Sequence, residues 1–150
     1  MKDKSKFRVY LSGPMTDKAT GKVSDENIIA FVRAQGLLKK EGYTNIFNPS
    51  RVWVCKWRWL YRILAGITSE HTAYCLVLLY DLWQLMQCDL IYKIPGWRES
   101  RGASTESSVA YHFTIWTLPQ PVRERIDKKL VKSMEKWREK HAASDSPDHQ

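Results

Sequence analysis

The sequence predicts a single α/β domain with a Rossmann-like, flavodoxin-like parallel sheet flanked by helices. Short runs rich in β-branched and aromatic residues alternate with longer segments in which apolar residues recur at helical spacing. The resulting order, β-α-β-α-β-loop-α, needs crossover connections, and right-handed crossovers place helices on the faces of a parallel sheet. A chain of 150 residues has the size of one domain. We expect it to occupy residues 1–141, with a disordered polar tail at 142–150.

The first half of the chain contains two predicted strands and the helix between them. These elements are a strand over 7–11, a polar loop over 16–22, a helix from Ser24 to Gly42 and a strand over 43–47. The first strand ends at Ser12–Pro14 and the second at Asn48 and Pro49, because Gly and Pro interrupt regular structure. The predicted helix has an apolar stripe of Ile28, Phe31, Val32 and Leu38. Residues 50–69 fit no single element.

The second half contains the remaining elements. They are a helix over 73–87, a strand over 89–94, a helix over 103–113, a strand over 114–118 and a helix over 122–141. The first of these helices has one apolar side, formed by Leu76, Leu79, Trp83 and Met86, while Asp81 and Gln84 share a different face. The last helix has an apolar face of Ile126, Leu130, Met134 and Trp137. That face either packs on the domain or joins subunits.

Composition limits the classes of protein to consider. Cys55, Cys75 and Cys88 have neither an even count nor the spacing of metal ligands, so we expect no disulfide framework and no metal. The first residues lack the apolar stretch of a secretory signal, and the most apolar run, 73–80, is too short to cross a bilayer. We therefore expect a cytoplasmic protein without a membrane partner or cofactor.

The net charge of +8 raises the question of nucleic-acid binding. Much of the excess lies near the two ends of the chain, where charges are usually solvated. A more informative segment is 51–62, in which Trp, Tyr, Lys and Arg interleave as they do on platforms that stack bases. The same pattern describes an amphipathic segment with Trp53–Tyr61 packed on a core or a neighbouring subunit. Both readings remain open.

The segment from Pro95 to Glu106 has the character of a site. It lies between a predicted buried strand and a predicted helix, and it brings one carboxylate to the start of that helix. With Ser104 or Thr105 as the cap, Glu106 falls in the first turn, where free N–H groups and the helix dipole favour its ionised form. An ionised carboxylate at the carboxyl edge of a sheet is a candidate nucleophile. The alternative is that a helix simply favours an acidic residue in its first turn.

The carboxyl ends of parallel strands meet at one edge of a sheet, and ligands bind there. Three segments follow predicted strands and should lie at that edge: Ser12–Met15, Asn48–Pro49 and Gly96–Glu106.

These residues together resemble the nucleoside 2-deoxyribosyltransferase-like superfamily, in particular a small branch with Ser-Gly-Pro and Gly-Trp-x-x-Ser-x-Gly-Ala motifs. The resemblance covers residues 7–115. It rests on the order and spacing of Tyr10–Thr16, Gly42–Tyr43, Asn48–Pro49, Asp81–Leu82, Cys88–Asp89, Gly96–Ala103 and Glu106.

The resemblance implies cleavage or exchange of the N-glycosidic bond of a deoxynucleoside or its 5′-monophosphate. Glu106 corresponds to the nucleophile, which would form a glycosyl-enzyme ester with net retention. Asp81 corresponds to an aspartate that orients the sugar or protonates the leaving base. Tyr10 corresponds to a tyrosine near the nucleophile. Without the resemblance, Asp81 reads as a solvated helix acid and Tyr10 as a core residue.

The resemblance also implies a set of substrate-binding residues. The candidates are Ser12, Gly13, Met15, Asn48, Asp89, Gly96, Trp97, Ser100 and Gly102. Ser100 and Gly102 would contact a 5′-phosphate, with charge from Arg98 and Arg101. Pro14 and Thr16 stand where some monophosphate-cleaving members have serine and arginine, which weakens the phosphate assignment.

Three functions follow as alternatives: an N-glycosidase, a base-exchanging deoxyribosyltransferase, and a non-catalytic module that binds a nucleotide or nucleic acid. The base, the sugar and the presence of a phosphate stay open. A homo-oligomer, dimeric or larger, is expected because sites in the family are often completed across subunits. The seven tryptophans point the same way, since interfaces favour Trp.

Overall fold

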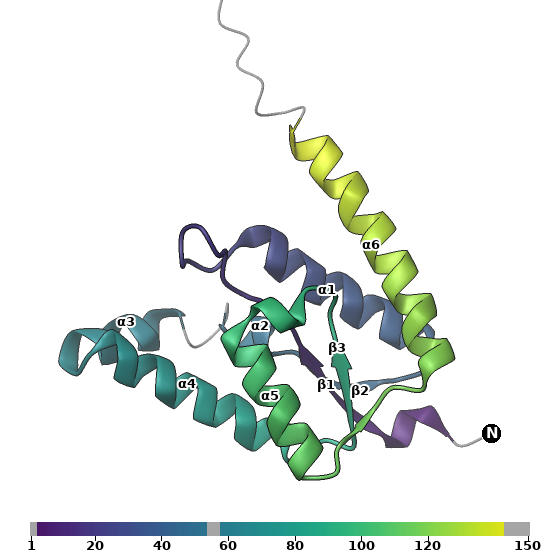
Figure 1. The fold of residues 1–150 in the computed structure, drawn as a ribbon, viewed down its shortest axis with the longest axis horizontal. Helices are drawn as coiled ribbons and strands as arrows, with labels where there is room; N and C mark the ends of the chain where they lie inside the picture. Colours follow the sequence, from purple (N-terminus) through teal and green to yellow (C-terminus); the bar gives the residue numbers. More distant parts are fainter. Residues whose placement is uncertain (1–2, 54–57, 143–150) are drawn as a thin grey trace, which may run out of the picture.

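The computed structural model describes residues 3–53 and 58–142 (Figure 1). In chain order the elements are η1 Lys4–Lys6, β1 Arg8–Ser12, α1 Asp25–Lys40, β2 Asn45–Phe47, α2 Pro49–Val52, α3 Arg58–Ile67, α4 Glu70–Leu85, β3 Leu90–Lys93, η3 Trp97–Glu99, α5 Arg101–His112, β4 Trp116–Thr117 and α6 Gln120–Ala142. The strands form one sheet in the order β2-β1-β3-β4, and every pair is parallel. The predicted Rossmann-like fold is therefore confirmed, with a flavodoxin-like strand order.

Strand β1 lies at the point where the strand order reverses. Tyr10 lies opposite Phe47 of β2 on one side and Ile91 of β3 on the other, and Ser12 lies opposite Lys93. Ligands in open parallel sheets bind outside the carboxyl ends of the strands at such a reversal. The ends of β1 and β3 therefore mark the expected position of a site.

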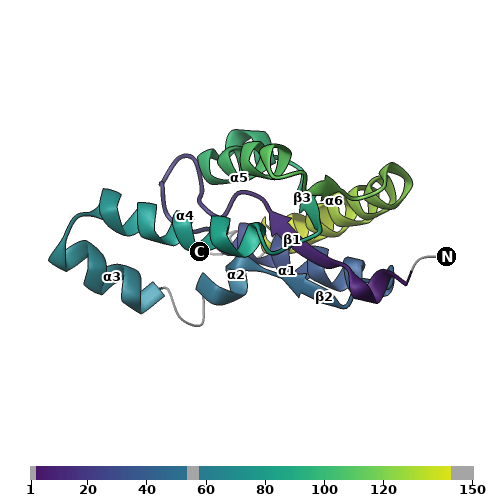
Figure 2. The ribbon, with the colours of Figure 1, turned by 90° about the horizontal axis from the view of Figure 1, so that it is seen from below.

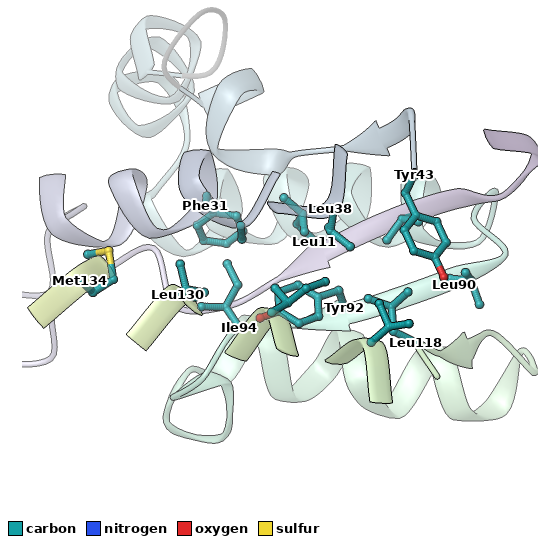
Figure 3. Packing of buried hydrophobic residues seen from close by; sticks show 14 residues of the cluster. Leu11, Phe31, Leu38, Tyr43, Leu90, Tyr92, Ile94, Leu118, Leu130 and Met134 are labelled. Carbon is teal, nitrogen blue, oxygen red and sulfur yellow. The ribbon is translucent and has the colours of Figure 1, made fainter. Parts of the chain in front are cut away.

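Side chains of the strands alternate between the two faces of the sheet. On one face, Val9, Leu11, Leu90 and Tyr92 pack against α1 and α6, and Figure 3 shows this cluster. Its other members come mainly from the two helices: Phe31, Ala34 and Leu38 from α1, and Val122, Ile126, Leu130 and Met134 from α6. The apolar face of the last helix therefore packs on the domain.

The opposite face holds a smaller cluster beneath α4 and α5. Its buried residues are Tyr10, Leu85, Cys88, Ile91 and Ala110. Two polar residues with buried side chains, Ser12 and Glu106, lie on this same face.

Several predicted boundaries and faces need correction. Helix α4 begins at Glu70, because Ser69 caps it by accepting from the Thr72 N–H. Val32 of the predicted α1 stripe is 54% exposed, since the buried positions follow the spacing Phe31, Ala34, Leu38 instead.

The predicted apolar side of α4 does not face the core of the domain. Leu76, Leu79, Trp83 and Met86 are all exposed, and α4 packs on the domain through another side that includes Ala73, Val77 and Leu85. Figure 2 shows α3 and α4 side by side, extending as a hairpin away from the sheet.

The Trp-rich segment is described in part. Trp53 follows α2 as its C-cap and packs edge-on against Tyr61 of α3, and residues 54–57 lie outside the described residues. Ala142 ends α6, and the rest of the predicted tail, 143–150, also lies outside them. None of the helices in 3–53 and 58–142 combines the length and apolar character needed to cross a membrane.

Candidate active site

The candidate site is built around the carboxyl group of Glu106. This side chain is on α5, is only 6% exposed, and faces the end of β1. The Tyr10 hydroxyl donates to Oε1 at 2.8 Å, and the Ser12 hydroxyl donates to Oε2 at 2.5 Å. Each carboxyl oxygen thus has its own donor, which fixes the orientation of the group.

Strand periodicity places the two donors together. Tyr10 and Ser12 are two residues apart on β1, so both point to the face that α5 covers. Tyr10 is also held by its ring, which stacks on Phe47 of β2 with centroids 5.4 Å apart. The Tyr10 pKa lies well above its usual value, first because of burial and then because of the charge of Glu106, so its hydroxyl stays a donor.

The helix that carries Glu106 begins earlier than predicted. Ser100, and not Ser104 or Thr105, caps α5 by accepting from the Ala103 N–H, so Glu106 lies in the second turn. The dipole effect is strongest within the first turn. Burial instead raises the pKa of Glu106 to about 7, although the hydrogen bonds from Ser12 and Tyr10 act in the opposite direction. The expectation that the helix start favours the ionised form is therefore wrong.

A second buried carboxyl group interacts with the first. Asp81 of α4 is 6% exposed, and burial followed by the charge of Glu106 raises its pKa to about 8. No hydrogen bond to the Asp81 carboxyl group forms among the described residues, unlike the doubly bonded Glu106. Two interacting carboxyl groups with raised pKa values hold one proton between them over a range near neutral pH. The reading of Asp81 as a solvated helix acid is excluded by its burial.

Sequence reasoning missed Tyr74 of α4. It lies seven residues before Asp81, two turns along the same helix, and this spacing is the signal that could have found it. Its hydroxyl is 3.7 Å from the position of a β-carbon added at Gly102. Its pKa is raised by burial and by the charge of Glu106. Tyr74 therefore lies near the start of α5, close enough to Glu106 and Asp81 for their charges to affect its pKa.

The loop before α5 places the other predicted residues near the start of that helix. Gly96 has φ +91°, a conformation that favours glycine, and it begins the short helix η3. The ring of Trp97 lies under the Lys93 ammonium, with 4.5 Å between Nζ and the ring centroid. Ser100 and Gly102 open α5, so they share one helix with Glu106, but the Ser100 hydroxyl serves as the cap.

Four further predicted substrate-binding residues have structural contacts of their own, and none of these contacts is with Glu106. Gly13 follows β1 directly, but its lack of a side chain serves packing, since an added β-carbon would be 2.9 Å from that of Ile94. Met15 packs on the cluster beneath α1 and α6, which is the other face of the sheet.

Asn48 caps α2, and its amide donates to Gln35 at 3.0 Å. Asp89 precedes β3 and accepts from the Arg8 N–H at the amino edge of the sheet, opposite to the edge where the strands end.

A separate cavity of about 380 Å³ lies on the other side of α5, towards β4. Lys93, Ser107, Tyr111 and His112 are among the residues that line it, and Glu106 is not. Lys93 donates to the Ser107 hydroxyl at 2.7 Å, and burial lowers its pKa. Among the described residues no three His, Cys, Asp or Glu side chains are grouped as a metal ion requires.

A family model described as "Domain of unknown function (DUF4406)" matches residues 7–117. The chain belongs to this family. The DUF4406 region contains all four strands, both buried carboxyl groups and the hydroxyl donors of Glu106, and the whole of α6 lies outside it. Neither the search of curated proteins nor the search of solved structures gave a significant match.

Proposed function

We propose that this protein cleaves the N-glycosidic bond of a nucleoside, a deoxynucleoside or one of their 5′-monophosphates, with Glu106 as the nucleophile. The observation that carries the proposal is the pair of interacting buried carboxyl groups. One of them is oriented by two hydroxyl donors, and the other has no hydrogen-bond partner among the described residues. The resemblance to nucleoside 2-deoxyribosyltransferases supports the same roles.

The environments of the two groups suit different tasks. Glu106 has the lower pKa, about 7, because Ser12 and Tyr10 stabilise its charge, so it ionises first. Asp81 has the higher pKa, about 8, and keeps the shared proton longer. A nucleophile and a general acid with pKa values on either side of the working pH form a common pattern in glycoside cleavage.

In the proposed reaction, the Glu106 carboxylate attacks C1′ as the bond from C1′ to the base nitrogen breaks. Asp81 donates its proton to the leaving base, and the sugar becomes an ester of Glu106. Asp81, now ionised, accepts a proton from water as the water oxygen attacks C1′ and releases Glu106. Two displacements at the same carbon give net retention.

The two hydroxyl groups have positioning roles. Their hydrogen bonds keep both Glu106 oxygens fixed relative to the end of β1. As the ester forms, negative charge leaves the carboxylate, so these bonds weaken and do not accelerate the attack by themselves. Their contribution is orientation, which is worth a large share of many enzymatic rate enhancements.

The test is release of free base from a panel of nucleosides, deoxynucleosides and their 5′-monophosphates, followed by chromatography. We expect Glu106→Ala to lower the rate of release by at least about 1,000-fold. Glu135→Ala, at an exposed position on α6, is the matched control and should keep the rate of the unmodified chain. Release that continues unchanged in Glu106→Ala would refute the proposal.

The same panel separates the alternatives. With a second base added, a new nucleoside would indicate exchange instead of hydrolysis. If no panel member is cleaved but a nucleotide or nucleic acid binds, the non-catalytic reading is favoured. Binding through phosphate contacts would then fall steeply with added salt, and Glu106→Gln would not affect it.

A further inference from the structure

Helix α3 is rich in apolar residues but is not buried. Seven of its ten residues are apolar, yet none of its residues is buried. Its exposed residues include Trp59, Ile63 and Ile67, which are spaced four residues apart along one stripe. An isolated helix of ten residues is marginal in water, so an exposed apolar stripe of this kind calls for a partner.

Helix α4 adds a second stripe. Leu76, Leu79, Trp83 and Met86 follow a 3-4-3 spacing, which is the a-d-a-d pattern by which one helix packs along another. These four residues are 41% to 61% exposed, and Asp81 lies between them in sequence but on the buried side. The stripe therefore runs along the helix that carries Asp81, on the side away from the site.

The area matches a protein interface. With roughly 200 Å² for a large apolar side chain, the seven exposed fractions correspond to about 750 Å². Each partner in an interface of standard size contributes about 800 Å². The two stripes together expose more apolar area than the largest patch of a typical monomeric protein.

We infer that the α3–α4 hairpin is the interface with a second copy of this chain. Two hairpins related by a twofold axis would place each α4 stripe against its counterpart and form a four-helix bundle. Arg58 and Arg62 of α3 are exposed beside the stripe, but the stripe on α4 has the spacing by which helices pack, which favours another helix over nucleic acid or a lipid surface. This interface does not depend on the chemistry proposed for Glu106.

The experiment is the mass of the full chain in solution, measured by light scattering after size-exclusion chromatography at tens of micromolar. We expect twice the chain mass of 17.6 kDa. The variant L79E/W83E, which places charges at two exposed stripe positions, should have the mass of one chain and a dissociation constant raised at least about 100-fold. The control Tyr111→Glu, at an 84% exposed position on α5, should remain a dimer.

Circular dichroism of L79E/W83E should show a helical, cooperatively unfolding chain. If that variant does not fold, hydrogen exchange of the unmodified chain provides the second measurement: protection of 58–67 and 70–85 should fall on dilution. A monomeric unmodified chain overturns the inference, as does a variant that stays dimeric. Binding of a monomeric chain to vesicles of phosphatidylcholine and phosphatidylserine would instead assign the surface to a membrane.

Discussion

Replacing Glu106 by Gln should make the protein more stable at alkaline pH. The carboxyl group is almost fully buried, and its pKa is raised from 4.5 to about 7. The folded state therefore binds the proton more tightly than the unfolded state does. The contribution of Glu106 to stability is full below pH 4.5 and is lost as the pH rises to about 7, because the folded chain must then hold a buried charge.

The difference of about 2.5 pH units corresponds to about 3 kcal/mol, at roughly 1.4 kcal/mol for each unit. Glutamine has the same shape as the protonated acid, and its amide can accept from one of the hydroxyls of Tyr10 and Ser12 and donate to the other. At pH 8 we expect Glu106→Gln to raise the free energy of unfolding by about 3 kcal/mol. That increase corresponds to about 6 °C or more in Tm for a chain of this size. Near pH 4 the two proteins should be nearly equal.

The measurement is urea unfolding of both proteins at several values of pH between 4 and 8, with the same slope m required in each case. Glu135→Gln is the control, because an exposed acid should change the free energy by less than about 0.5 kcal/mol. The reasoning is refuted if the difference between Glu106→Gln and the unmodified chain is independent of pH, or if the variant is less stable at pH 8.

Three further results are expected. The rate of base release should peak between pH 7 and 8, where Glu106 is ionised and Asp81 is still protonated. Asp81→Asn should lower this rate about 100-fold or more and remove its decline at alkaline pH. Gly13→Ala should lower the free energy of unfolding by about 1 to 3 kcal/mol in a urea titration, because the new β-carbon would be 2.9 Å from that of Ile94. Gly102→Ala should raise it by up to about 1 kcal/mol, since α5 gains an alanine with its nearest neighbouring atom 3.7 Å away. If a 5′-phosphate approaches that backbone, the same variant should lose activity on monophosphates but keep activity on nucleosides.

The architecture could be predicted from the sequence because strands and helices here follow clear periodicities. Leu90–Lys93 is nearly continuous in apolar residues, as expected for a strand buried on both faces. The errors occurred where one pattern fits two environments. The stripe from Leu76 to Met86 has the spacing of a helix face that packs on another surface. Spacing alone does not say whether that surface is the chain's own core or another molecule.

The sequence indicated which residues form the site better than it indicated how deeply they are buried. Ser12 and Glu106 could be named from the segments that follow predicted strands, and Tyr10 from the family resemblance. The structure joins the three by two hydrogen bonds. The burial of Glu106 was not predictable, because it depends on where α5 begins. Ser100, Ser104 and Thr105 are all suitable caps, and the choice of Ser100 moves Glu106 from the first turn to the second.

The use of Ser100 as the cap changes what sets the pKa of Glu106. In a first turn, the helix dipole would lower the pKa of Glu106 and leave an ionised but weakly basic carboxylate. In the observed position, burial raises the pKa of Glu106 to about 7, and burial together with the charge of Glu106 raises the pKa of Asp81 to about 8. The pKa of Asp81 depends in part on the charge of Glu106, so neutralising Glu106 should lower the pKa of Asp81 by removing the second of its two causes. Glu106→Gln therefore tests the coupling as well: by NMR, the Asp81 carboxyl group should titrate at a lower pH in the variant than in the unmodified chain.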